Sequence, residues 1–201
     1  MKREIIAILR GIKPNEVLAV AHSIAESGIT QIEVPMNSPD VFDSIKLLCD
    51  EFRDDIQIGA GTVTNTKQVE TLSDIGGVRF IVSPNFDPEV VKATKEAKII
   101  SYPGVTTASE CYSAINCGAD GLKFFPASLL GIENFKALKA ILPKDIPFYM
   151  VGGVGPENFL SWFDAGATGF GIGSGLYKAG DGAEIVYEKA MTIVLSYDKA
   201  K

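Results

Sequence analysis

The chain of 201 residues has one histidine, three cysteines and no long apolar run. His22 stands alone in a helical pattern, so acid–base catalysis by histidine is not expected. Cys49, Cys111 and Cys117 lack the spacing of metal ligands, which predicts reduced, partly buried thiols in a cytoplasmic protein. No stretch approaches the roughly 20 apolar residues of a membrane helix. The short apolar run near the N-terminus predicts a first strand and not a signal peptide.

The chain also has no excess of basic residues. Lysine and arginine total 19 against 25 acidic residues, which gives a formal net charge of −6. Nucleic acid is therefore not an expected partner, because binding its phosphates needs a basic face. An anionic substrate must instead be held by a local site. The hydrophobic fraction of 46% is ordinary for a soluble globular protein and predicts one compact domain over residues 1–201.

Short apolar runs alternate with amphipathic stretches along the whole chain. Eight runs have the length and composition of strands: Ile5–Leu9, Gln31–Pro35, Ile56–Val63, Phe80–Ser83, Ile99–Tyr102, Gly121–Phe125, Phe148–Val151 and Gly169–Ile172. Eight strands alternating with helices predict an α/β fold with a parallel sheet, closed as a compact (β/α)₈ barrel. A doubly wound open sheet is the alternative, but no G-x-G-x-x-G fingerprint follows the first strand.

Several helix starts carry local signals. Ser38 followed by Pro39 predicts an N-cap with proline at the first helical position. Thr107 opens a capping-box sequence before another helix. Further helices are expected to start near Gly155 and at Asp181.

Lys123 lies inside an apolar strand with the sequence Gly-Leu-Lys-Phe-Phe-Pro. Because strand side chains alternate, Leu122 and Phe124 should face the helices while Lys123 and Phe125 point into the barrel. Burial disfavours the charged amine and lowers its pKa. A neutral lysine amine is the nucleophile of Schiff-base catalysis. The alternative is an interior lysine that pairs with a carboxylate for structural reasons.

Glu33 follows the same alternation, because Ile32 and Val34 should face outward. A buried carboxylate is rarely without a partner, and Lys123 or Arg10 is the expected one. A structural ion pair and a general acid and base both fit this arrangement. An ionised Glu33 would oppose the lowering of the Lys123 pKa, and the sequence leaves open which effect wins.

Polar residues and glycines stand where the strands end, and barrels of this kind carry their active sites at that edge. Arg10 could bind a carboxylate or phosphate and Thr62 offers a hydroxyl, although a rim charge and a turn-stabilising hydroxyl fit equally. The loops after the last two strands are the usual phosphate site of the fold. Their backbone N–H groups, together with the helix expected near Gly155, predict phosphate binding. These loops contain Gly152-Gly153-Val154 and Gly171-Ile-Gly173-Ser174-Gly.

Seven motifs in this order resemble the aldolases that cleave 2-keto-3-deoxy-6-phosphogluconate and 2-keto-3-deoxy-6-phosphogalactonate. The motifs are Ile-Ala-Ile-Leu-Arg10-Gly, Ile-Glu33-Val-Pro-Met-Asn-Ser, Ile-Gly-Ala-Gly-Thr62-Val, Ile-Val-Ser-Pro84-Asn, Leu-Lys123-Phe-Phe-Pro-Ala, Val-Gly-Gly153-Val and Gly-Ile-Gly173-Ser174. The resemblance spans nearly the whole chain. It implies a Schiff-base role for Lys123 and a proton-transferring role for Glu33. It also implies a homotrimer that needs no metal or other cofactor.

The same resemblance divides the expected substrate site into two ends. Residues around the keto-acid part are Arg10, Thr62 and Pro84, with Phe125 beside Lys123. Residues at the phosphate end are Gly152, Gly153, Val154, Gly173 and Ser174.

Asn37 differs from the residue that one branch of the similar aldolase family carries at this position. The gluconate-type branch usually carries arginine four residues after the glutamate, whereas Glu-x-Pro-x-Asn-Ser resembles the galactonate-type branch. The implied reaction cleaves 2-dehydro-3-deoxy-6-phosphogalactonate to pyruvate and D-glyceraldehyde 3-phosphate, with Asn37 helping to select the C4 hydroxyl. Alternatives are the same chemistry on the gluconate epimer or on 4-hydroxy-2-oxoglutarate, a phosphosugar isomerase or epimerase, and a non-catalytic sugar-phosphate sensor.

Overall fold

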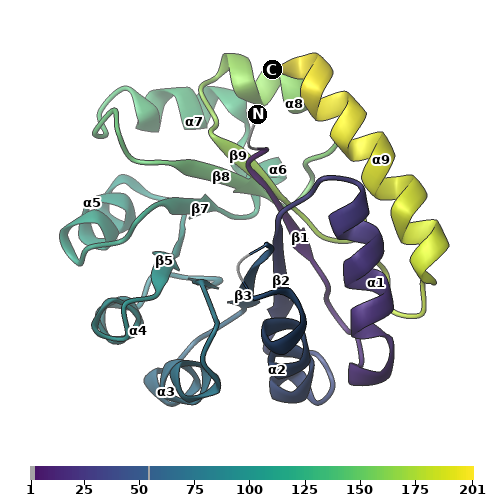
Figure 1. The fold of residues 1–201 in the computed structure, drawn as a ribbon. Helices are drawn as coiled ribbons and strands as arrows, with labels where there is room; N and C mark the ends of the chain where they lie inside the picture. Colours follow the sequence, from purple (N-terminus) through teal and green to yellow (C-terminus); the bar gives the residue numbers. More distant parts are fainter. Residues whose placement is uncertain (1–2, 54) are drawn as a thin grey trace.

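The computed structural model, which describes residues 3–53 and 55–201, has a ring of parallel strands surrounded by helices (Figure 1). The strands are β1 (Ile5–Ile8), β2 (Gln31–Pro35), β3 (Gln57–Gly61), β4 (Phe80–Val82), β5 (Ile100–Tyr102), β6 (Gly104–Val105), β7 (Leu122–Phe124), β8 (Phe148–Val151) and β9 (Gly169–Ile172). The helices are α1 (Pro14–Glu26), α2 (Val41–Phe52), α3 (Thr66–Ile75), α4 (Pro88–Glu96), α5 (Ala108–Asn116), α6 (Ala127–Leu130), α7 (Ile132–Lys139), α8 (Phe159–Asp164) and α9 (Ala183–Ala200). All eight predicted strands are present with ends within two residues, and the predicted α/β barrel is confirmed.

The barrel closes at the segment that carries β5 and β6. The strands are hydrogen-bonded in the order β5-β4-β3-β2-β1-β9-β8-β7-β6. β5 and β6 are consecutive parts of one segment, separated by Pro103, which has no N–H to donate. β5 pairs with β4 and β6 pairs with β7, so this segment joins the two ends of the sheet. The sequence predicts Ile99–Tyr102 as a strand but does not predict its continuation in β6.

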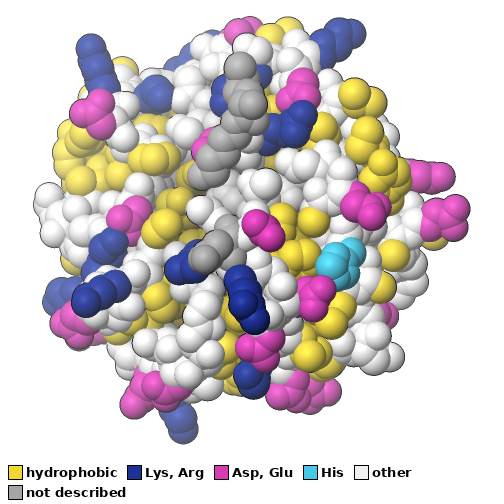
Figure 2. Space-filling view, in the orientation of Figure 1, with side chains coloured by type: hydrophobic (Ala, Val, Ile, Leu, Met, Phe, Trp, Pro, Cys, Tyr) yellow, Lys and Arg dark blue, Asp and Glu magenta, His cyan; other side chains and the backbone are white. Residues whose placement is uncertain are grey.

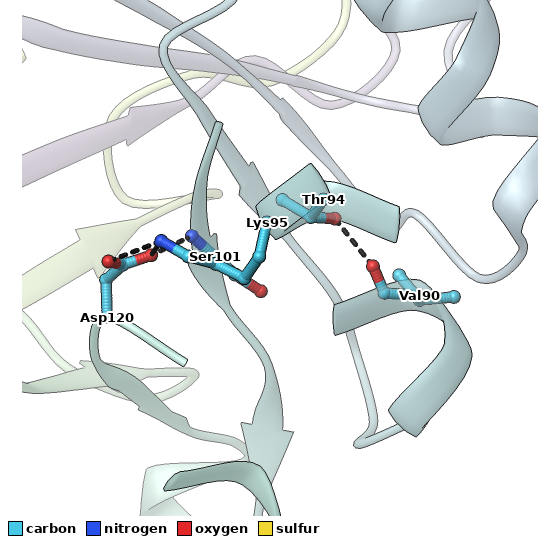
Figure 3. A network of polar contacts seen from close by, with 5 residues as sticks. All are labelled: Val90, Thr94, Lys95, Ser101 and Asp120. Atoms are coloured by element: carbon cyan, nitrogen blue, oxygen red, sulfur yellow. Dashed lines mark hydrogen bonds and ion pairs between the residues drawn. The ribbon is translucent and has the colours of Figure 1, made fainter. Parts of the chain in front are cut away.

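β5 does not pair with β7, but polar contacts connect β5 to the residue Asp120 just before β7. Figure 3 shows these contacts. The Asp120 carboxylate accepts hydrogen bonds from Lys95 Nζ at 2.6 and 2.7 Å and from the Ser101 backbone N–H at 2.8 Å. The Asp120 backbone N–H donates in turn to the Ser101 carbonyl at 3.0 Å. Within α4, the buried Thr94 hydroxyl donates to the Val90 carbonyl at 2.7 Å. These contacts hold α4 and the closing segment against the start of β7.

The strand side chains face two separate layers. Outward-facing Phe124 packs against Phe135 of α7 and Phe148 of β8, with ring centroids 5.1 and 5.6 Å away. A smaller cluster fills the barrel interior and consists of Ile6, Phe80, Val82, Tyr102 and Tyr149. The Phe80 ring uses the space that β3 leaves at Gly59, where a Cβ would lie 2.4 Å from the ring. The interior is therefore a packed apolar floor beneath the carboxyl ends of the strands.

The predicted helix start at Ser38 and Pro39 is wrong. α2 begins at Val41, and its N-cap residue Asp40 has a φ of 42°. The Gly11 backbone N–H donates a hydrogen bond of 2.9 Å to the Ser38 hydroxyl. Ser38 therefore holds the loop after β1 and does not cap a helix, a tertiary contact that local sequence does not reveal.

Two other predicted helix starts are shifted and one is confirmed. α8 begins at Phe159 and not near Gly155, because the chain first makes a turn closed by a 3.0 Å backbone hydrogen bond to the Gly155 carbonyl. The last helix begins at Ala183, since the Asp181 carboxylate accepts a backbone N–H of the preceding turn at 2.9 Å. The capping box that opens at Thr107 is confirmed at the start of α5.

The three thiols agree with the sequence prediction of buried or partly buried side chains. Figure 2 shows acidic and basic side chains interspersed over the face that it presents, with no field of one sign. His22 is exposed, and its Nε2 lies 2.8 Å from a Glu51 carboxylate oxygen. Cys49 and Cys111 are buried, and Cys117 is partly buried. Among the described residues, no helix combines the length and apolar character required to cross a bilayer.

Candidate active site

A cleft of about 740 Å³ lies at the carboxyl ends of the strands. Ten of the twelve predicted site residues line it: Arg10, Thr62, Pro84, Lys123, Phe125, Gly152, Gly153, Val154, Gly173 and Ser174. Glu33 and Asn37 are outside this lining. Seven further residues line it. Gly171 and Gly175 belong to the predicted glycine-rich loop, whereas Ile8, Val151, Glu157, Tyr177 and Lys178 were not predicted. Ten of the predicted residues are thus brought together from six different strand ends and loops.

Lys123 lies at the centre of β7 and is only 5% exposed. Its Nζ is 4.7 Å from the centroid of the Phe125 ring, inside the cleft. Burial lowers the pKa of the Lys123 amine, Glu33 acts in the opposite direction, and the Arg10 charge lowers it further. The net direction is downward, so desolvation outweighs the carboxylate, which settles the balance that the sequence leaves open. A larger share of this amine is neutral than of an exposed lysine.

Glu33 lies on β2, is 2% exposed and points into the barrel as predicted. It lines a cavity of about 10 Å³ together with Lys123 and four residues of the apolar floor, which are Ile6, Val82, Tyr102 and Tyr149. Burial raises the pKa of Glu33 to about 7, although the charges of Lys123 and Arg10 pull it down. Its Oε2 atom is buried and has no hydrogen-bond partner among residues 3–53 and 55–201. A carboxyl group whose charge changes near neutral pH, and whose Oε2 atom accepts no hydrogen bond from the described residues, can accept or deliver a proton beside Lys123.

Glu33 fits in the barrel because its neighbour on β3 is a glycine. A Cβ on Gly61 would lie 2.6 Å from Glu33 Oε1 and 2.8 Å from the carboxyl carbon. Those distances are shorter than van der Waals contact, so any side chain at position 61 would displace the buried carboxyl group.

We expect Gly61→Ala to destabilise the protein by about 1 to 3 kcal/mol, the usual range for overpacking a core. Gly182→Ala is the matched control, because apart from its chain neighbours no described residue has an atom within 4 Å of a Cβ built at Gly182. Thermal unfolding of both variants beside the unsubstituted protein measures the difference. Equal melting temperatures for the two variants would show that the Glu33 carboxyl group is not confined by β3.

Arg10 is held at the rim of the cleft by two neighbouring loops. Its Nη1 donates to Asn37 Oδ1 at 2.5 Å, and its Nη2 lies 3.5 Å from Thr62 Oγ1. Thr62 has a φ of 58°, which is an unusual conformation for a β-branched residue. Such local strain is typical of functional positions. Arg10 therefore presents its guanidinium group near Thr62 and Lys123, where an anionic substrate group could bind.

The opposite end of the cleft is formed by the loops after β8 and β9. Gly152 and Gly153 have φ values of 87° and 71°, a region that favours glycine. Asn158, which the sequence analysis missed, accepts from the Gly155 N–H at 3.1 Å and donates to the Gly153 carbonyl at 3.1 Å. Asparagine directly before a helical run is an N-cap signal that could have identified it. The Asn158 side chain therefore fixes the shape of this glycine-rich loop.

The family model described as KDPG and KHG aldolase matches residues 1–187. A protein of Rhizobium meliloti (strain 1021), named probable 2-dehydro-3-deoxy-6-phosphogalactonate aldolase, is 45% identical over 98% of this chain and 93% of its own length. The 2-dehydro-3-deoxy-6-phosphogalactonate aldolase of Escherichia coli (strain K12) is 43% identical over 99% of this chain and 97% of its own length. The KHG/KDPG aldolase of the same strain is 31% identical over 73% of this chain and 68% of its own length.

The solved structures agree with these sequence relationships. A structure described as native KDPGal superposes with a TM-score of 0.97 at 42% identity and covers 100% of this chain and 97% of that one. The barrel fold agrees with this assignment. The chain belongs to the family of KDPG and KHG aldolases.

Proposed function

We propose that Lys123 forms a Schiff base with the C2 ketone of a phosphorylated 2-keto acid, as in a class I aldolase. The observation that carries this proposal is the burial of Lys123 where the cleft meets the apolar floor, in the same small cavity as Glu33. A phosphosugar isomerase needs no imine, and a sensor has no use for a buried amine beside a buried carboxyl group. The pair therefore favours the aldolase over both alternatives.

Lys123 supplies the nucleophile and Glu33 the acid and base for the proposed reaction. The Lys123 amine adds to the C2 ketone, and loss of water leaves a protonated imine that can accept an electron pair. Glu33 removes the proton of the C4 hydroxyl, directly or through a water molecule, and the C3–C4 bond breaks to release the aldehyde. The bonding electrons move into the imine and form an enamine. Protonation of the enamine at C3 and hydrolysis of the imine release pyruvate and restore Lys123.

The two ends of the cleft suit the two charged ends of such a substrate. In this proposal Arg10 and Thr62 bind the carboxylate beside C2, with Pro84 and Phe125 around the keto carbon, and all four residues line the cleft. The phosphate belongs at the opposite end, in the loops after β8 and β9, because glycine lets backbone N–H groups approach a phosphate closely. That end is lined by Gly152, Gly153, Val154, Gly173 and Ser174, and by Lys178, the cation that the sequence analysis missed. Binding both ends fixes the reacting carbons between Lys123 and Glu33.

We further propose 2-dehydro-3-deoxy-6-phosphogalactonate as the substrate, with pyruvate and D-glyceraldehyde 3-phosphate as products. Relatives named for this activity match 98 to 99% of the chain at 43 to 45% identity, whereas a relative named KHG/KDPG aldolase matches 73% at 31%. A homotrimer in the cytoplasm completes the proposal. Exposed Leu129, Ile141 and Leu160 offer apolar surface for contacts between copies.

The test is pyruvate release from three compounds, followed with lactate dehydrogenase and NADH. We expect kcat/KM for the galactonate epimer to exceed that for the gluconate epimer by about tenfold, roughly the effect of one hydrogen bond. The third compound, 4-hydroxy-2-oxoglutarate, lacks the phosphate and should react more slowly than either. Faster cleavage of the gluconate epimer would reassign the substrate, and no pyruvate from any of the three would overturn the aldolase proposal.

A further inference from the structure

We infer that Asn37 is a positioning residue that aims Arg10 at the substrate carboxylate, and not a direct contact of the C4 hydroxyl. The inference rests on the proposed function, because it gives Arg10 a carboxylate to bind. It replaces the role that the sequence suggests for Asn37 with one based on contacts. Asn37 is outside the cleft lining, while Arg10 is part of it.

The contact between the two side chains is direct. Asn37 Oδ1 accepts a hydrogen bond of 2.5 Å from Arg10 Nη1, so the amide oxygen is turned toward the guanidinium group. Arg10 Nη2 lies 3.5 Å from Thr62 Oγ1 on the other side. The guanidinium group carries five N–H donors, and these two contacts leave others free for an incoming carboxylate. The guanidinium is thus oriented before a ligand arrives.

Asn37 can orient Arg10 because hydrogen bonds fix the residue before Asn37 and the residue after it. The Met36 backbone N–H donates to the Gly61 carbonyl at 2.7 Å, which ties the residue before Asn37 to β3. The residue after it, Ser38, is buried and accepts the Gly11 N–H at 2.9 Å, which ties it to the loop after β1. Asn37 is therefore fixed between the end of β3, which Thr62 follows, and the loop after β1, which carries Arg10.

A neutral amide suits this task better than a carboxylate. An arginine side chain has many rotamers, and fixing it before binding removes an entropic penalty from the binding step. The amide oxygen fixes the guanidinium without neutralising its charge. An aspartate at position 37 would orient Arg10 as well but would compete with the substrate for that charge.

The experiment measures the pyruvate concentration at which borohydride traps half of the protein as a secondary amine. We expect Asn37→Ala to raise this concentration by about 2- to 10-fold, the range for ordering one flexible side chain. Asn37→Asp is expected to raise it further. Asn134→Ala on α7 is the matched control, since Asn134 is exposed and outside the cleft lining. Trapping of acetone, which has no carboxylate, should be the same in Asn37→Ala as in the unsubstituted protein.

The double variant decides whether Asn37 acts through Arg10. When Arg10→Ala is already present, adding Asn37→Ala is expected to cause no further rise, because the positioned group is gone. A full additional rise would overturn the inference. So would an Asn37→Ala variant that binds pyruvate normally but changes the preference between the C4 epimers. The two failures are distinguishable. No labelling of the unsubstituted protein by pyruvate would overturn the proposed function, whereas normal labelling with no effect of Asn37→Ala would overturn this inference alone.

Discussion

Replacement of Lys123 by methionine is expected to lower kcat by about 10⁴-fold or more while the protein remains folded. Methionine has a similar length and no nucleophilic nitrogen, so the imine cannot form. The lowered pKa of Lys123 means that its burial disfavours the charged form, which costs folding free energy below that pKa. Methionine removes this cost. The melting temperature of the Lys123→Met variant near neutral pH should therefore equal or exceed that of the unsubstituted protein.

Trapping with borohydride and pyruvate locates the imine in the unsubstituted protein. Lys139 is an internal control, because burial lowers its pKa as well. Its Nζ donates to the Gly166 carbonyl at 2.5 Å, and Lys139 lines a different pocket from the cleft. Peptide masses should show modification of Lys123 and not of Lys139. Modification of both lysines would mean that a lowered pKa suffices without the cleft, and an unmodified Lys123 would rule out the proposed mechanism.

Strand periodicity was sufficient to predict the positions of the two central side chains. Alternation along β2 and β7 places Glu33 and Lys123 inward because a strand has only two faces. The barrel followed from eight such runs separated by helical patterns. The net direction of the Lys123 pKa could not be predicted in this way, because it depends on how much water the surrounding side chains exclude.

The features that sequence reasoning missed depend on contacts between distant segments. Ser38 has the sequence signature of a helix cap, yet the Gly11 N–H occupies its hydroxyl. β6 exists because Pro103 interrupts a strand that must still reach β7 to close the barrel. Asn37 was predicted near the C4 hydroxyl from a family pattern, whereas its contact with Arg10 requires three-dimensional proximity. Local patterns thus predict which residues face the cleft, and tertiary contacts decide what they touch.

Glu33→Gln is expected to lower kcat by about 10²- to 10⁴-fold, the usual effect of losing a general acid and base. Glutamine keeps the size and the polarity of the side chain but cannot take up the C4 hydroxyl proton. Imine trapping by pyruvate should persist, because the Lys123 nucleophile is retained. Glu89→Gln on the exposed face of α4 is the control for removal of one carboxylate. An unchanged kcat in Glu33→Gln would remove the proposed role of Glu33.

The pH dependence of the same variant tests the electrostatic explanation separately. Because the pKa of Glu33 is raised to about 7, kcat/KM of the unsubstituted protein should rise as pH increases through 7, and Glu33→Gln should lack this limb. The raised pKa also means that the buried neutral acid stabilises the fold below about pH 4.5 and that this contribution is lost as pH rises through about 7. Glutamine stays neutral, so Glu33→Gln should be more stable than the unsubstituted protein at pH 8 but not at pH 4. Opposite changes in activity and stability at pH 8 would link the proton transfer to the desolvation of one carboxyl group.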